Sequence, residues 1–321
     1  MRISARRDRF LREVVRRMRA LLKGHIVVAW CSLWIPGPAW CLQTEGTQIP
    51  EGTVVHRDLD YVGDGHPRHM LDLYVPPGVE TPPLIIWIHG GAWLAGDKAN
   101  PRPLPYLNKG YAVASINYRL SRHAVFPAQI VDCKTAVRWL RANAARFGYD
   151  AERFAVWGES AGGHLAALLG TTGDTSVFEP LDGFEVTSRV QAVVDFFGPT
   201  DLLQMDDRRL PDGMVHNAPD SPESKLVGGP LQENREKAES ANPVRYVSPE
   251  DPPFLIVHGD SDPLVPHHQS ELLAAALEAA GVPVTFYTVK GAGHGGFRDP
   301  TVAALVEEFL ARYLGTPAVT R

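Results

Sequence analysis

Cysteine is scarce in this sequence, which contains three cysteines in 321 residues. Cys31 and Cys41 lie within residues 1–43, and Cys133 falls within a predicted helix. A mature chain that begins after this segment would hold a single thiol and no internal disulfide. Its stability must then come from a hydrophobic core, in which Cys133 is interpreted as a small buried side chain rather than a nucleophile.

The sequence also lacks the patterns typical of metal and nucleic-acid sites. It contains no His-Glu-x-x-His motif, no cysteine cluster and no acidic loop of the calcium-binding type, so we expect no metal and no cofactor. The formal net charge is −5, but residues 1–43 carry nine Lys or Arg and two acidic residues, which leaves −12 for residues 44–321. Because phosphate backbones bind to basic surfaces, this acidic body argues against nucleic acid as a partner.

No long hydrophobic run is present in the basic leader, residues 1–43. Its apolar run from Ile26 to Ile35 is too short to span a bilayer. A basic start, an apolar run and a following Pro-Gly-Pro are typical of a bacterial export signal, with Met1 and Met18 as alternative start codons. A cleaved signal predicts a secreted or periplasmic protein, whereas a retained leader would anchor the chain to a membrane.

Apolar runs alternate with helical patterns across residues 44–321. The runs "TVVHRDLDYV" and "HMLDLYV" alternate apolar and polar residues around a glycine-rich turn, which predicts a β-hairpin. Later runs such as "PLIIWIH" and "PFLIVHG" are continuously apolar, as in strands covered on both faces. Between them, apolar residues recur every three or four positions in "PAQIVDCKTAVRWLRANAARFG", where Gly148 ends the predicted helix. The pattern predicts an α/β fold with a mostly parallel sheet and helices on both faces.

One segment, residues 203–247, interrupts this alternation. It is rich in Pro, Gly, Asp and Glu and is too long for an ordinary connection. Ligands of parallel sheets bind beyond the carboxyl ends of the strands, and an insertion at this point would lie over those ends. We therefore interpret residues 203–247 as a lid-like insertion within a single domain.

Three predicted strands end in residues that could carry out nucleophilic catalysis. Ser160 stands between Gly158 and Gly162 in "WGESAGG", at a turn from strand to helix. Asp262 and His294 follow later strands, so the chain order is Ser, Asp, His. A serine hydroxyl becomes a nucleophile when a histidine takes its proton and a carboxylate fixes the tautomer of that histidine. From the residues alone, Asp260 competes with Asp262 for the acidic role.

An acyl transfer also needs N–H donors for the negative charge that develops on the carbonyl oxygen. The residue after the nucleophile, Ala161, and the Gly91–Ala92 stretch of "HGGAW" are placed to donate. Trp93, the next residue, is a candidate wall of the substrate pocket. His89 and His164 are interpreted as structural side chains, because one begins the "HGG" loop and the other lies a helical turn beyond Ser160.

The motifs "HGGAW", "GESAGG", "HGDSDPLVP" and "GAGHGG" resemble those of the α/β-hydrolase superfamily. The likeness runs from about Thr53 to Leu314. It is to the esterase and lipase branch, including hormone-sensitive-lipase-like enzymes and bacterial esterases of the acetyl xylan and feruloyl type. Ala92 departs from the pattern, since the more usual loop has a third glycine there. The spacing of the acid in the family pattern favours Asp262 over Asp260.

The resemblance implies an α/β-hydrolase catalytic domain and a serine carboxylic ester hydrolase that acts through an acyl-serine intermediate. Its expected partners are short-chain or aryl esters, including acetyl or feruloyl groups on plant polysaccharide. One alternative is a serine peptidase of the prolyl-oligopeptidase kind, although residues 44–80 leave no room for the extra domain that such enzymes use. Another is a non-catalytic binding protein on the same fold, although such proteins tend to lose a member of the triad.

Overall fold

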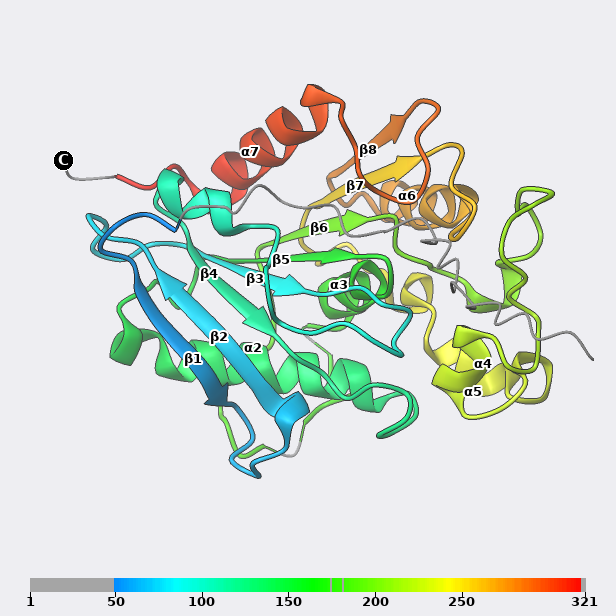
Figure 1. The fold of residues 1–321 in the computed structure, drawn as a ribbon, viewed down its shortest axis with the longest axis horizontal. Helices are drawn as coiled ribbons and strands as arrows, with labels where there is room; N and C mark the ends of the chain where they lie inside the picture. The colour runs from blue at the N-terminus through cyan, green and yellow to red at the C-terminus, as the bar shows by residue number, and fades with distance from the viewer. Residues whose placement is uncertain (1–48, 174, 181, 319–321) are drawn as a thin grey trace, which may run out of the picture. The chain divides into compact units, whose positions relative to one another are not determined.

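The computed structural model describes residues 49–173, 175–180 and 182–318 (Figure 1). They belong to the second of the two units into which the chain divides, residues 44–321. The predicted leader, residues 1–43, lies outside the described residues. Within the described ranges, none of the helices combines the length and the hydropathy needed to cross a membrane.

The described strands form one eight-stranded sheet in the order β1-β2-β4-β3-β5-β6-β7-β8. The strands are β1 (Val54–Asp60), β2 (Met70–Val75), β3 (Leu84–Ile88), β4 (Ala112–Ile116), β5 (Phe154–Glu159), β6 (Ala192–Phe196), β7 (Phe254–Gly259) and β8 (Val284–Val289). The predicted hairpin is confirmed, since β1 and β2 pair antiparallel, and β2 pairs antiparallel with β4 as well. The remaining pairs are parallel, which confirms the expected mostly parallel sheet.

Helices cover both faces of this sheet (Figure 1). The longer ones are α2 (Ala128–Phe147), α3 (Ala161–Thr172), α6 (His268–Ala280) and α7 (Pro300–Leu314). Adjacent residues of β3 point to opposite faces, so Ile86 packs in the core cluster with α2, α3 and α6, whereas Ile85 packs in the cluster with α7. Burial on both faces explains why the central strands read as continuous apolar runs.

Helix α2 forms where the recurring apolar residues predict a helix. It ends where the sequence predicted, at Gly148, whose φ of 77° lies in the left-handed region and whose N–H donates to Ala144 O at 2.9 Å. Cys133 lies on its buried face with no solvent exposure, and burial raises the pKa of its thiol well above the usual value. The interpretation of this cysteine as a small core side chain agrees with its position.

Residues 203–247 contain short helices joined by turns and irregular segments. The helices are α4 (Pro222–Val227), η4 (Leu231–Glu233), α5 (Arg235–Ser240) and η5 (Pro243–Tyr246), preceded by η3 (Leu202–Gln204). In Figure 1, α4 and α5 lie together beyond the tips of β3 and β5. His164 Nε2 donates to Ala241 O at 2.7 Å, so the segment is attached to α3 by a buried hydrogen bond.

Candidate functional site

Ser160 lies at a sharp turn between β5 and α3. Its φ of 53° and ψ of −122° put a residue with a Cβ in a region that favours glycine, so the turn is strained. The Ser160 N–H donates to Phe196 O at 2.9 Å, and Ser160 O accepts from the N–H of His164 at 3.0 Å. Bonds to β6 on one side and α3 on the other therefore hold the strained backbone in place.

Three glycines allow the strand and helix to approach at this turn. A Cβ at Gly158 would overlap the carbonyl of Gly162, and a Cβ at Gly162 would overlap the carbonyl oxygen of Ile88 in β3. A Cβ at Gly163 would overlap the carboxylate of Asp195 in β6. All of these contacts would be closer than 3.0 Å. Side chains larger than hydrogen would therefore clash at these three positions of "GESAGG", which explains why each of them is glycine.

Asp262 and His294 are joined by a short hydrogen bond. His294 Nδ1 donates to Asp262 Oδ2 at 2.6 Å, which leaves Nε2 as the unprotonated atom of the neutral ring. The ring of His294 packs against Phe197, with centroids 4.5 Å apart. Phe197 follows β6 with a φ of 44°, and its N–H donates to Val257 O at 2.9 Å. The imidazole is thus positioned by a carboxylate and by an aromatic face.

Asp262 is 2% exposed, and four donors surround its carboxylate. Oδ2 also lies 3.1 Å from His258 Nε2, and Oδ1 accepts from the N–H groups of Leu264 at 2.8 Å and Val265 at 3.0 Å. Burial by itself would raise the pKa of Asp262, but the hydrogen bonds from His258 and His294 outweigh it and hold the pKa well below the usual range. Asp262 is therefore a fixed anion at neutral pH.

The competing carboxylate, Asp260, faces elsewhere. It accepts a hydrogen bond from Gly291 N–H at 2.7 Å and lies 3.4 Å from the exposed Lys290 ammonium. The backbone bond from Gly291 lowers the pKa of Asp260. The structure thus places Asp262, and not Asp260, against His294.

A small cavity of about 70 Å³ connects most of the expected site residues. The expected residues on its wall are Ala92, Trp93, Ser160, Ala161 and His294. Asp262 lies behind His294, and Gly91 is not among the described residues that line the cavity. Larger hollows of about 570 and 700 Å³ open elsewhere on the surface, but neither is lined by Ser160 or His294.

The loop after β3 has an unusual backbone. Gly91, Ala92 and Trp93 all have positive φ, at 110°, 55° and 56°. The carbonyl of Gly91 accepts from the N–H groups of Leu94 and Ala95, so Gly91 closes the turn that presents Ala92 to the cavity. Ala161 is the first residue of α3, and its N–H therefore has no carbonyl partner in the preceding helical turn.

Two buried histidines support this loop and the nucleophile helix. His89 Nδ1 donates to Gly90 O at 2.7 Å, Nε2 accepts from Arg68 at 2.8 Å, and the ring stacks on Tyr118 at 4.4 Å. His164 meets the edge of Trp93 at 5.2 Å. Burial lowers the pKa of each histidine to about 4, so both are neutral structural side chains, in agreement with the sequence interpretation.

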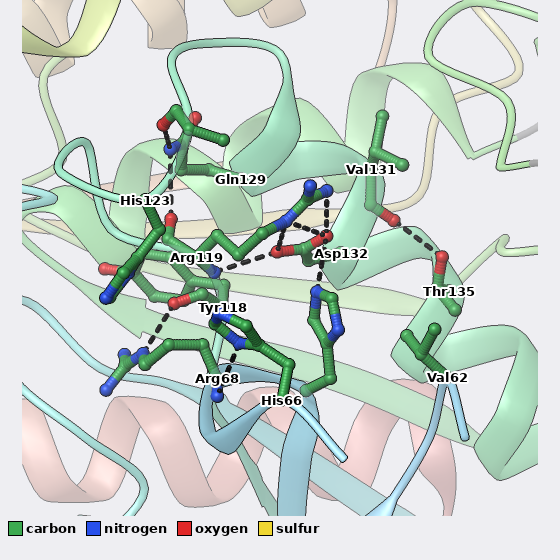
Figure 2. A network of polar contacts seen from close by, with 12 residues as sticks. Val62, His66, Arg68, Tyr118, Arg119, His123, Gln129, Val131, Asp132 and Thr135 are labelled. Atoms are coloured by element: carbon green, nitrogen blue, oxygen red, sulfur yellow. Dashed lines mark hydrogen bonds and ion pairs between the residues drawn. The ribbon is translucent and has the colours of Figure 1, made fainter. Parts of the chain in front are cut away.

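Arg68 connects the loop to the antiparallel side of the sheet. Figure 2 shows its Nε donating to Tyr118 O, at 2.9 Å, beside the ion pair of Arg119 with Asp132. Arg68 also donates to Gly96 O at 3.0 Å, at the far end of the loop that begins at His89. One buried guanidinium therefore fixes both ends of this loop, a role that the sequence analysis did not foresee.

Residues 203–247 contribute cavity residues that the sequence analysis missed. They are Met214, Pro222 and Glu223, and Pro199 joins them from the loop after β6. Glu223 is 3% exposed, and its Oε1 accepts from His216 Nδ1 at 2.9 Å. An acidic residue within a segment rich in acids gives no local signal that it will be buried.

Comparison with known proteins relates this chain to esterases. The BD-FAE family model matches residues 71–277. The chain is 31% identical over 88% of its length to esterase LipQ of Mycobacterium tuberculosis, and 33% identical over 88% to the probable carboxylic ester hydrolase LipM of the same organism. In each case the matched part spans 65% of the relative's own length.

Solved structures give the same result. A truncated carbohydrate esterase from gut microbiota superposes with a TM-score of 0.74 at 34% identity, covering 81% of this chain and 96% of that one. An esterase of Thermogutta terrifontis superposes with a TM-score of 0.64 at 25% identity, covering 83% and 94%. The chain belongs to the BD-FAE family of esterases, and its fold is the α/β-hydrolase fold.

Proposed function

We propose that this member of the BD-FAE family is a carboxylic ester hydrolase that works through an acyl-serine intermediate. The observation that carries the proposal is the shared cavity: Ser160 and His294 line it together, and His294 is hydrogen-bonded to the ionised Asp262. A nucleophile, a base with a free Nε2 and a carboxylate that fixes the tautomer are the parts that such a reaction needs.

In the proposed acylation, His294 Nε2 takes the hydroxyl proton while Ser160 Oγ attacks the ester carbonyl carbon. Negative charge passes to the carbonyl oxygen, where the N–H groups of Ala92 and Ala161 stabilise it, with Gly91 shaping the loop. Removing one such donor typically costs about a hundredfold to a thousandfold in rate. The oxyanion then collapses, the C–O bond to the alcohol breaks, and His294 Nε2–H gives its proton to the departing oxygen.

Deacylation repeats these steps with water. His294 Nε2 takes a proton from water as the water oxygen attacks the acyl carbon. The acid leaves as the bond to Ser160 Oγ breaks, and the proton on His294 returns to Ser160. Asp262 stabilises the imidazolium in both halves and stays ionised throughout, because its pKa is held far below neutrality.

The cavity size favours a short acyl group over a feruloyl group. The cavity measures about 70 Å³, whereas the other described hollows measure about 440 to 700 Å³. Acetyl needs less of this space than a feruloyl group does, so the small volume favours the shorter acyl group. We propose acetyl esters as the substrate class, with residues 203–247 as the lid and residues 1–43 as an export signal.

Hydrolysis of p-nitrophenyl acetate tests the proposal. The purified protein should release p-nitrophenol, with an initial burst of about one equivalent per active site if deacylation limits turnover. Ser160→Ala should lose about 10⁴-fold or more in kcat, as expected when the nucleophile of a triad is removed. Activity that survives this substitution would remove Ser160 from the mechanism. Methyl ferulate should be a poor substrate, and efficient hydrolysis of it would contradict the proposed acyl preference.

A further inference from the structure

One buried carboxylate beside the candidate nucleophile has no part in the proposed mechanism. Glu223 lies in the first turn of α4 and lines the same cavity as Ser160 and His294. The rest of the wall that residues 199–265 contribute is apolar, formed by Pro199, Met214, Pro222, Leu264 and Val265. An anionic side chain in such a wall is costly to bury unless each oxygen has a hydrogen-bond donor.

Only half of this requirement is met within the protein. Glu223 Oε1 accepts from His216 Nδ1 at 2.9 Å. Glu223 Oε2 is fully buried and has no hydrogen-bond partner among the described residues. A buried acceptor without a donor destabilises a protein, so this oxygen is available to a donor that the protein does not supply, either a water molecule or a ligand.

The pair is also held rigidly. His216 is 1% exposed, and its backbone N–H donates to Asp206 Oδ1 at 2.9 Å. Ser221 caps α4 by accepting from Ser224 N–H at 3.1 Å, which fixes the first turn where Glu223 lies. These contacts hold His216 and the first turn of α4 in place around the Glu223 side chain.

We propose that Glu223 is a specificity residue that accepts a hydrogen bond from a hydroxyl group of the ester substrate. This inference rests on the proposed ester hydrolysis. A hydroxyl fits better than an ammonium, because His294 becomes a cation during each half-reaction and would repel a second positive charge in the same small cavity. A site built to bind a hydroxyl discriminates strongly against the analogue that lacks it, since the carboxylate is then left unpaired.

The test uses two matched pairs of esters and follows acid release in a pH-stat. In the alcohol pair, 2-hydroxyethyl acetate is compared with propyl acetate, so that a hydroxyl replaces a methyl group on the leaving alcohol. In the acyl pair, ethyl glycolate is compared with ethyl propionate, so that the same replacement is made on the acyl side. The two pairs distinguish a hydroxyl on the alcohol from one on the acid.

The wild-type protein should favour the hydroxylated ester of one pair by at least about tenfold in kcat/KM. In Glu223→Leu this ratio should fall by about tenfold to a hundredfold, the range expected for a hydrogen bond to a charged group. Glu223→Gln, which keeps the shape and removes the charge, should give an intermediate ratio. The matched control is Glu236→Gln in α5, which alters an exposed glutamate of the same insertion and should leave the ratio as in the wild type.

Two results would overturn the inference. One is a wild-type protein that hydrolyses these esters without preference in either pair, a result that does not depend on any variant folding. The other is a ratio that changes less than threefold in both Glu223 variants while their Tm values stay near that of the wild type. A wild-type protein that cleaves neither these esters nor p-nitrophenyl acetate would instead refute the proposed function itself.

Discussion

The contact between α3 and β3 behind Ser160 gives the sharpest prediction about the fold, tested by Gly162→Ala. Gly162 is the second residue of α3, where alanine is intrinsically favoured over glycine by about 1 kcal/mol. Helix propensity alone would therefore make the variant more stable. The new Cβ would, however, lie closer than 3.0 Å to the carbonyl oxygens of Ile88 and His89, which are backbone atoms at the end of a central strand.

Ile88 is paired in the sheet, and His89 O accepts a hydrogen bond from the Tyr118 hydroxyl at 3.0 Å, so we expect α3 to shift instead. Overpacking of this kind lowers the free energy of unfolding by about 1–3 kcal/mol. Because the new Cβ would meet two backbone atoms, we expect the upper end of this range. After the gain of about 1 kcal/mol in helix propensity, the net loss for Gly162→Ala is about 2 kcal/mol. The shift also moves Ser160, two residues earlier. A displacement of about 1 Å at a reacting group costs on the order of a hundredfold in rate.

The matched control is Gly148→Ala at the end of α2. Gly148 has a φ of 77°, and nothing lies within 4 Å of an added Cβ, so the variant bears only the left-handed strain of about 1–2 kcal/mol. Urea unfolding and p-nitrophenyl acetate turnover of both variants provide the assay. Gly148→Ala should lose stability and keep its turnover, whereas Gly162→Ala should lose both. A Gly162→Ala protein as stable and as active as the wild type would refute the steric argument.

Two further predictions concern buried carboxylates. Asp262→Asn should lower the kcat for p-nitrophenyl acetate by about 10⁴-fold, because an amide cannot stabilise the imidazolium. The kcat of Asp260→Asn should stay within threefold of the wild type. A large loss in Asp260→Asn and a small one in Asp262→Asn would assign the acidic role to Asp260. Burial raises the pKa of Asp195 to about 7, so the wild type should lose stability as pH rises from about 4 to 7, by up to about 4 kcal/mol. Asp195→Asn keeps an acceptor for Gly198 N–H and should remove this dependence of stability on pH. If the Tm of the variant differs from that of the wild type by the same amount at pH 5 and pH 8, the prediction is wrong.

The sequence predicts the parts of the site that depend on local backbone chemistry. The strained turn at Ser160 needs small residues where strand and helix meet, so its glycines recur at a fixed spacing that can be read without a structure. The end of α2 is predictable for a similar reason, because glycine at position 148 readily adopts the left-handed conformation that ends a helix. The parallel sheet is predictable as well, because strands buried on both faces are apolar throughout.

The remaining parts depend on contacts between distant segments. Phe197 lies directly after β6 and has a positive φ, and it packs against the ring of His294. Its neighbours in the sequence do not predict that backbone conformation. Arg68 reaches the loop at His89 across 21 positions of sequence. The environment of Glu223 depends on how the short helices of residues 203–247 pack on α3, and helices of this length have little intrinsic preference of their own.

Asp262 and Glu223, two buried carboxylates of the candidate site, differ in how many donors the protein gives them. Asp262 is saturated: His258, His294 and two backbone N–H groups bind its oxygens, so it has no capacity left for a ligand and can only orient and stabilise the histidine. Glu223 has one donor, from His216, and a second oxygen without a partner among the described residues. Because a carboxylate takes its chemical role from its donors, the same functional group serves the proposed proton transfer at one position and the proposed recognition of a hydroxyl at the other.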